Sequence, residues 1–215
     1  METPVNEEDL VYNVILDYLN QNRPFRSSEI IPYITSRFTK ASVNINENGI
    51  KEILRSLVQK KLLVEGSVLT KKELLHNPKR KQIFRIVRNH PGIIFNHIVR
   101  TSKFSNYIVY WHLSILVRFN CVSKAMVGKH QIFFISSVDV EDATVVHFTS
   151  KKNSIKIIEY LRNNDIGITK TQLSTELKMH INTVSKYLRN LGSINVINRE
   201  LISNKILYFL NEDYF

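Results

Sequence analysis

One stretch of this chain occurs twice, and that repeat limits what the chain can fold into. Residues 92–135 align without a gap with residues 167–210, at a constant offset of 75. The identical pairs are Gly92 and Gly167, Ile93 and Ile168, Lys103 and Lys178, Val109 and Val184, Leu113 and Leu188, Leu116 and Leu191, Asn120 and Asn195, and Phe134 and Phe209. Self-similarity at a fixed spacing is typical of chains built from repeated small domains. We therefore expect one small unit that is used at least twice.

Each copy predicts three helices followed by a β-hairpin. In the later copy the third helix is marked by apolar residues at i, i+3, i+4 and i+7, namely Val184, Tyr187, Leu188 and Leu191. A capping box of Thr169 and Gln172 opens the second helix, and residues 194–210 form two apolar runs around a polar turn at 203–205. The earlier copy predicts helices near 78–90, 95–102 and 105–118, and a hairpin with its tip at 127–130. This order of elements is that of a winged helix-turn-helix.

A fainter third copy lies upstream at an offset of 59, with helices expected near 7–21, 27–37 and 47–60. Residues 62–69 leave room for one short strand pair before Thr70 and Glu73 cap another helix. The predicted fold is mainly α with short β wings, in three tandem winged helix-turn-helix domains. These are a divergent domain at 1–70 with a short or missing wing, a basic domain at 71–138, a linker at 139–150, and a third domain at 151–215.

The positive charge of the chain is concentrated in its middle. The formal net charge is +11, and residues 71–140 hold 12 basic and 2 acidic residues, or +10. Residues 1–70 carry −1 and residues 141–215 carry +2. A local basic excess attracts a polyanion or an anionic membrane surface, while a solvated face selected for solubility is the plainer alternative.

The third unit has residues suited to reading DNA. In a helix-turn-helix the third helix can enter the major groove, and flanking parts meet phosphates. The outward residues of this helix are expected at i, i+3, i+4 and i+7, and they are Asn182, Ser185, Lys186 and Arg189. Arg199, Asn204 and Lys205 lie on or beside the wing. We expect these residues to contact double-stranded DNA, rather than to form a plain polar surface.

The middle unit differs, because its third helix is aromatic rather than basic. Tyr107, Tyr110 and Trp111 are expected on its exposed side, which favours a protein interface, packing against another domain, or contacts to thymine methyls and sugars. The expected DNA-binding cations of this unit lie elsewhere, at Lys79, Arg80, Lys81, Arg85, Lys124 and Lys129. We expect a homodimer or a protein partner to bind through the first domain or this middle helix.

Several classes of function are disfavoured by missing motifs. One cysteine, Cys121, cannot form an internal disulfide or a cysteine-built zinc site, and no phosphate-binding glycine loop is present. The histidines of the middle unit lack metal-ligand spacing, and His112 is expected to be a satisfied, half-buried ring. No catalytic arrangement stands out, so we expect neither enzyme activity nor a metal or cofactor. No apolar stretch is long enough to span a membrane and no signal peptide is evident, which predicts a cytoplasmic protein.

Three segments carry a resemblance to known regulators. SNYIVYWHLSIL and INTVSKYLRNL resemble the T-V-S-x-H-L-x-x-L recognition-helix pattern of ArsR-type and MarR-type winged-helix regulators. NHPGIIFNHIV is similar to the N-P-G-I-x-F-x-x-I signature of archaeal tandem winged-helix transcription regulators. The resemblance covers about residues 75–215 well and the first 70 loosely. It implies a cytoplasmic DNA-binding transcription regulator that can be dimeric.

Together these observations predict a sequence-specific regulator that binds duplex DNA through recognition helices and wings. The alternative is a winged-helix assembly subunit that binds proteins, as in ESCRT-II sorting complexes or RNA polymerase accessory subunits. That alternative predicts a stable hetero-complex and weak, non-specific affinity for DNA.

Overall fold

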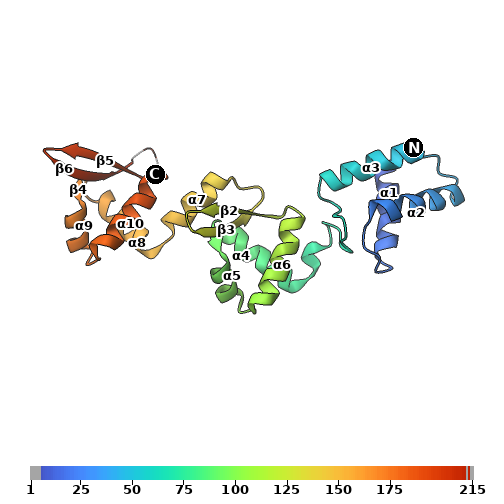
Figure 1. Cartoon of the computed structure of the whole chain (residues 1–215), viewed down its shortest axis with the longest axis horizontal. Coiled ribbons are helices and arrows are strands. Elements are labelled where there is room, and N and C mark those ends of the chain that lie inside the picture. The colour runs from blue at the N-terminus through green and yellow to red at the C-terminus, as the bar shows by residue number, and fades with distance from the viewer. Residues whose placement is uncertain (1–5, 212, 214–215) are drawn as a thin grey trace. The chain divides into compact units, whose positions relative to one another are not determined.

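The computed structural model describes residues 6–211 and residue 213 of the chain. They form a mainly helical fold with two small three-stranded sheets (Figure 1). The chain packs as two compact units: residues up to Ile86 together with Ile98–Ser123, and Val87–His97 together with the residues from Lys124 onward. The boundary passes through the middle repeat, so the division into three tandem domains stays a prediction. No helix within residues 6–211 is both long and apolar enough to cross a membrane.

The chain begins with a three-helix cluster of α1 (Glu7–Leu19), α2 (Ser27–Lys40) and α3 (Glu47–Gln59). Asn6 and Asn46 cap α1 and α3 by accepting hydrogen bonds from backbone N–H groups. The core of this cluster is apolar, with Ile15, Ile30 and Ile50 fully buried. Burying such side chains stabilises the cluster by about 1.5–3 kcal/mol each.

The segment after α3 forms no strand, so the short strand pair that the sequence allows at 62–69 is absent. The segment is held instead by backbone hydrogen bonds on both sides of Phe25, whose N–H donates to Ser67 and whose carbonyl accepts from Gly66. Thr70 and Glu73 form only one half of the predicted capping box. The Glu73 carboxylate accepts from the Thr70 N–H and hydroxyl, but the Glu73 N–H donates to the Thr70 carbonyl and not to its side chain. Only one 3₁₀ turn follows, η1 (Leu74–His76).

Two repeats follow with the same order of elements. The first contains α4 (Pro78–Asn89), β1 (Ile93–Ile94), α5 (Phe95–Ser102), α6 (Asn106–Arg118), β2 (Val122–Val127) and β3 (His130–Ile135). After α7 (Val140–Thr149), the second contains α8 (Lys152–Arg162), β4 (Ile168–Thr169), α9 (Lys170–Glu176), α10 (Ile181–Gly192), β5 (Ile197–Ile202) and β6 (Lys205–Leu210). These elements form the winged helix-turn-helix fold that the sequence predicts.

Each hairpin gains a third strand that the sequence does not predict. β1 pairs with β3 and β4 pairs with β6, and both pairs are antiparallel. The registers are equivalent, because Ile93 opposes Phe133 and Ile168 opposes Tyr208, which are the same positions at the offset of 75. Two-residue strands are too short to produce a periodic pattern, so only the pairing reveals them.

The backbone repeats its unusual conformations at the identical residues. The φ angles of Gly92 and Gly167 are +78° and +75°, and those of Lys103 and Lys178 are +60° and +49°. Asn120 and Asn195 also adopt the left-handed conformation, at +52° and +56°. A left-handed lysine is uncommon and carries strain. The identities between the two copies therefore mark the turns as well as the core.

The predicted linker at 139–150 contains helix α7. Ala143 of α7 is buried in a cluster with Ile132 and Phe134 of β3, so α7 covers one face of the middle sheet. A Cβ at Gly92 would lie 2.2 Å from the Ala143 carbonyl oxygen. At the equivalent Gly167, a Cβ would instead meet the ring of Phe209 at 2.4 Å. Different groups therefore occupy the space beside the equivalent glycines of the two repeats.

We predict that Gly92→Ala destabilises the protein by about 1–3 kcal/mol more than Gly128→Ala. Both glycines have positive φ, but an alanine Cβ at Gly128 meets nothing within 4 Å. Both variants share the backbone strain, and the overpacking against α7 adds about 1–3 kcal/mol at Gly92 alone. Urea unfolding followed by circular dichroism measures the difference. Equal losses for the two variants would show that α7 does not press on Gly92.

Candidate nucleic-acid interface

Helix α10 is amphipathic, and its buried face sets the direction of its polar face. Val184, Leu188 and Leu191 are buried in the hydrophobic cluster that residues 157–210 form. His180 caps the helix, because its Nδ1 accepts from the Asn182 N–H at 3.2 Å. On the opposite side Asn182, Lys186 and Arg189 are exposed and Ser185 is half-buried. The structure thus brings the four predicted reading residues onto one accessible face.

The β5–β6 hairpin is a complete wing beside α10. Its strands pair in register from Ile197 with Leu210 to Ile202 with Lys205. The two turn residues, Ser203 and Asn204, both have left-handed φ angles of +48° and +62°. A two-residue turn with both φ angles positive matches the right-handed twist of paired strands. Arg199, Asn204 and Lys205 are exposed on this hairpin, as the sequence predicts.

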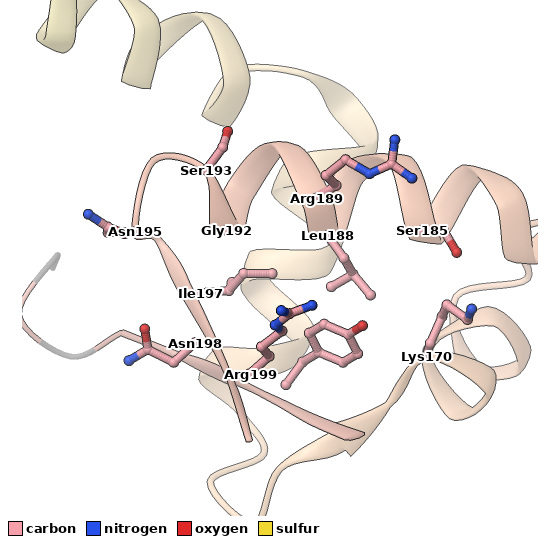
Figure 2. A pocket seen from close by; sticks show the side chains of 11 residues that line it. Lys170, Ser185, Leu188, Arg189, Gly192, Ser193, Asn195, Ile197, Asn198 and Arg199 are labelled. Atoms are coloured by element: carbon pink, nitrogen blue, oxygen red, sulfur yellow. The ribbon is translucent and has the colours of Figure 1, made fainter. Parts of the chain in front are cut away.

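A polar groove of about 600 Å³ lies between α10 and the hairpin. Lys170 at the start of α9, Ser185 and Arg189 of α10, and Asn198 and Arg199 of β5 are among the residues that line it. In Figure 2 the side chains of Lys170, Ser185 and Arg199 reach into the space between helix and strands, while Arg189 extends along α10. Two cationic side chains, Lys170 and Arg199, therefore reach into the groove, and Arg189 borders it on the predicted reading face.

The groove cations have no carboxylate partner among the described residues. The ion pairs within residues 6–211 join Arg26 to Glu29, Lys51 to Glu47, and Lys60 to Glu8, all within residues 8–60. Lys170, Arg189 and Arg199 take part in none of them. Unpaired cations around a groove attract an anion such as a phosphate, whose binding releases counterions.

Lys170 is a groove residue that sequence reasoning does not assign to the interface. It is the first residue of α9, placed by the Thr169–Gln172 capping box, which the structure confirms in both directions. The capping box predicts where this helix starts but not what its first residue faces. Its position becomes evident only when β4 pairs with β6 and brings α9 beside the wing.

The predicted cations of the middle unit are exposed, with one exception. Lys79, Lys81 and Arg85 lie on α4, and Lys124 and Lys129 lie on or beside β2. Arg80 is only 3% exposed. Its guanidinium donates a hydrogen bond to the Leu74 carbonyl at 3.0 Å and lies 5.9 Å from the centre of the Trp111 ring. Arg80 is therefore a structural residue, and we do not retain it as a DNA contact.

Helix α6 presents the aromatic surface that the sequence predicts. Tyr107 and Tyr110 are exposed and Trp111 is 48% exposed, while Val109, Leu113 and Leu116 are buried. The Trp111 ring contacts the His112 ring edge-on, with the centroids 4.7 Å apart. We refer to Tyr107, Tyr110 and Trp111 as the aromatic face of α6.

His112 is more buried than the sequence predicts, and it is not satisfied. Its ring is buried and its Nδ1 has no hydrogen-bond partner in the described structure. Burial lowers the pKa of His112, and the nearby positive charges of Arg80 and Lys79 lower it further. The ring is therefore held neutral, which a position beside the buried Arg80 guanidinium favours. No group of three or more His, Cys, Asp or Glu residues that could hold a metal occurs in the described part of the chain.

A second buried histidine, His147, ties α7 to the turn before β1. Its Nδ1 lies 2.8 Å from the Gly92 carbonyl oxygen, and its Nε2 lies 3.0 Å from the Lys151 Nζ. With Nδ1–H donating to Gly92, Nε2 is free to accept from Lys151, so the geometry suits a neutral ring. Burial lowers the pKa of His147, the Gly92 hydrogen bond opposes that effect, and Lys151, His130 and His97 lower it further. Burial also lowers the pKa of Lys151, and the positive charge of Lys186 on α10 lowers it further.

Comparison with known proteins gives a distant relative. No family model matches the chain. The chain is 22% identical, over 96% of its length, to a protein of Methanocaldococcus jannaschii that is named an uncharacterized HTH-type transcriptional regulator. The alignment covers 53% of that relative, so the chain spans about half its length.

We predict that the protein loses stability as the pH falls from 7.5 to 5.5, and that His147→Gln reduces this loss. Because the folded-state pKa of His147 lies below its unfolded value of about 6.5, the unfolded chain takes up the proton first as the pH falls. The stability from a neutral His147 is therefore complete above that value and is lost below it. His112 acts with the same sign and accounts for part of the remaining slope.

Urea midpoints measured at several pH values test this prediction. His180→Gln, which replaces the exposed cap of α10, is the control for a histidine substitution outside α7. A midpoint that stays constant or rises between pH 7.5 and 5.5 in the wild type would contradict the assignment of a neutral buried ring.

Proposed function

We propose that this protein is a transcription regulator that binds double-stranded DNA in a sequence-specific manner through α10 and the β5–β6 wing. The observation that carries the proposal is the groove between them, which is lined by Lys170, Arg189 and Arg199 without a carboxylate partner among the described residues. The distant relative named an HTH-type regulator supports the same class of function. The proposed organisation is three tandem winged helix-turn-helix domains at 1–70, 71–138 and 151–215.

In this proposal α10 lies in the major groove. Asn182, Lys186 and Arg189 are exposed on the side of α10 away from its core, and amide and guanidinium groups form paired hydrogen bonds with adenine and guanine edges. A phosphate backbone passing between α10 and the wing lies against Lys170 and Arg199. Ser185 and Asn204 add polar contacts, and Lys205 adds a cation at the wing tip. The helix supplies discrimination between sequences, and the groove supplies affinity.

The middle repeat contributes non-specific affinity. This repeat lies in the segment 71–140, whose net charge is +10. Its exposed cations are Lys79, Lys81 and Arg85 in one compact unit, and Lys124 and Lys129 in the other. Cations that neutralise phosphates release counterions, so binding weakens as salt increases. This role needs no base contacts and does not require α6 to enter a groove.

The aromatic face of α6 favours a protein-binding role for that helix. Tyr107, Tyr110 and Trp111 occupy the positions at which α10 carries Asn182, Ser185 and Lys186, at the offset of 75. Exposed Trp and Tyr anchors are enriched at protein interfaces. We propose that this face joins two copies of the chain or binds a partner protein. The first domain, with a net charge of −1, is the other candidate for partner binding. The aromatic face of α6 is also the observation that favours the alternative function, a winged-helix assembly subunit.

We expect no enzyme activity and no cofactor, and a cytoplasmic location.

We predict that Arg189→Ala and Lys186→Ala each weaken binding to a preferred duplex by about 1–3 kcal/mol and narrow the gap to random DNA. The reason is that the loss of a base contact lowers the affinity for the preferred duplex, which has the matching base, and not the affinity for random DNA. Lys170→Ala is the matched control, because its proposed contact is a phosphate and its loss should weaken both duplexes equally. Fluorescence anisotropy of the full chain with labelled duplexes, selected in vitro and random, measures both effects. If Arg189→Ala and Lys186→Ala leave both affinities unchanged, α10 is not the reading helix.

We predict that Trp111→Ala shifts the protein from dimer toward monomer, or releases a bound partner, while the chain stays folded. A buried Trp anchor contributes about 2 kcal/mol or more at an interface. Analytical ultracentrifugation measures the mass, and Met126→Ala, which truncates an exposed apolar side chain elsewhere, is the control. Trp111 is the only tryptophan of the chain, so its fluorescence gives a second readout. Emission that is freely quenched by iodide until duplex DNA is added would place the helix at the DNA instead.

A further inference from the structure

Lys151, between α7 and α8, has a ring nitrogen rather than a carboxylate as its hydrogen-bond partner. Its Nζ lies 3.0 Å from Nε2 of His147, one helical turn earlier in the chain. Lys60, in contrast, forms an ion pair with Glu8. A carboxylate partner strongly favours the ammonium form of a lysine, and a neutral imidazole nitrogen favours it less. The contacts of Lys151 are therefore those of a reactive amine rather than of a paired charge.

His147 has the tautomer and the orientation of a general base. Its Nδ1 lies 2.8 Å from the Gly92 carbonyl oxygen, and only a protonated Nδ1 can donate to that oxygen. Burial lowers the pKa of His147 and keeps the ring neutral, so Nε2 has a lone pair that faces Lys151. Gly92 is fixed in turn, because its N–H donates to the Phe133 carbonyl at 3.0 Å. A nucleophile, a base and a group that orients the base thus form one chain of hydrogen bonds.

The surroundings of Lys151 disfavour the charged form of its amine. Lys151 is half-buried, and burial followed by the positive charge of Lys186 lowers the pKa of the amine. The Phe148 ring, whose centre lies 4.8 Å from Nζ, opposes this shift, because an aromatic face attracts an ammonium. None of the ion pairs within residues 6–211 includes Lys151. More of the amine is therefore unprotonated near neutral pH than for an ordinary lysine, and only the unprotonated form attacks a carbonyl carbon.

The charge around the amine selects the kind of reagent that approaches it. Lys186 of α10 is exposed, and its positive charge acts on the Lys151 amine. A reagent with a negative leaving group is attracted by this charge. Acyl phosphates combine an electrophilic carbonyl carbon with such a leaving group, and small ones can reach a half-buried amine. They therefore fit this site better than neutral acyl donors.

We propose that Lys151 is a site of covalent acylation, at which its amine takes the acyl group of a small acyl phosphate with His147 as the general base. Nζ attacks the carbonyl carbon and forms the C–N bond. The bond from that carbon to the phosphate oxygen breaks, and the phosphate leaves with the electron pair. The proton lost from Nζ passes to His147 Nε2 and then to water. The product is an uncharged amide whose N–H can still donate to Nε2.

The modification changes the charge beside the proposed reading helix. Loss of the positive charge at Lys151 removes its repulsion of Lys186 and lowers the positive potential around α10. This consequence rests on the proposed function, but the acylation itself does not, because it needs only the contact between Lys151 and His147. The test therefore uses no DNA, and its failure leaves the proposed function unaffected.

The test incubates the full chain with acetyl phosphate at pH 7.5 and follows acetylation by mass spectrometry. Cleavage after Glu141 and Glu159 leaves Lys151 and the exposed Lys152 in one peptide, so their rates are compared directly. We expect Lys151 to react at least roughly tenfold faster, because a positioned base contributes about 10²–10⁴-fold and partial burial offsets some of that gain. In concentrated urea the two rates should become equal, because the contact with His147 exists only in the folded chain.

His147→Gln should lower the Lys151 rate to that of Lys152, and circular dichroism shows whether this variant is folded. His130→Gln is the matched control and should keep the wild-type ratio, because it removes an exposed imidazole, with its ring centre 6.2 Å from that of His147, and leaves the base in place.

Equal rates for Lys151 and Lys152 in the folded wild type overturn the inference, and so does a ratio that survives urea. A folded His147→Gln chain that keeps the wild-type ratio overturns it as well, because His147 is then not the base. If His147→Gln does not fold, the comparison of the wild type in buffer and in urea decides.

Discussion

The burial of one stripe of α10 is the interaction on which the rest of the candidate interface depends. Val184, Leu188 and Leu191 are removed from water, at about 1.5–3 kcal/mol each, and they leave the helix with one favoured rotation about its axis. Asn182, Lys186 and Arg189 therefore face outward because the opposite stripe of the helix is buried, and no contact of their side chains is needed to orient them. The wing is positioned by the same core, since Ile197 belongs to it and Tyr208 and Leu210 pack against it. A single apolar cluster therefore orients both walls of the groove.

Much of the fold could be predicted from the sequence because its signals are local. The apolar spacing of α6 and α10, the capping box at Thr169 and the turn at Ser203 each act within a few residues. Lys170 and His147 could not be predicted, because their surroundings are created by chain pairing: β4 with β6 in one case, and α7 against Gly92 in the other. The periodicity of α4 does not reveal that Arg80 is buried, since a long cationic side chain looks the same whether it is solvated or enclosed.

The repeats have diverged in the parts that meet the surroundings while keeping the parts that fold. The left-handed glycine, lysine and asparagine recur in both later copies, and so do the buried apolar positions of α6 and α10. The outward face of the same helix, in contrast, is aromatic in one copy and polar in the other. The first copy has lost its hairpin between α3 and η1, within the described residues. Such a pattern is expected when duplicated domains share a folding requirement but take separate roles.

The different covers over Gly92 and Gly167 have a consequence for exchange between the repeats. In the middle copy a helix backbone occupies the space above the glycine, and in the third copy the Phe209 ring fills it. Phe134, the counterpart of Phe209, is instead buried against Ala143 of α7. Because positions 134 and 209 both hold phenylalanine, exchanging the two sheet sequences would leave a ring at each place. The groups packed against the sheet, with α7 over the middle one, therefore decide which space that ring fills. The same pair of a left-handed glycine and a phenylalanine therefore serves two packing arrangements, and in the middle copy a helix from outside the repeated stretch selects one of them.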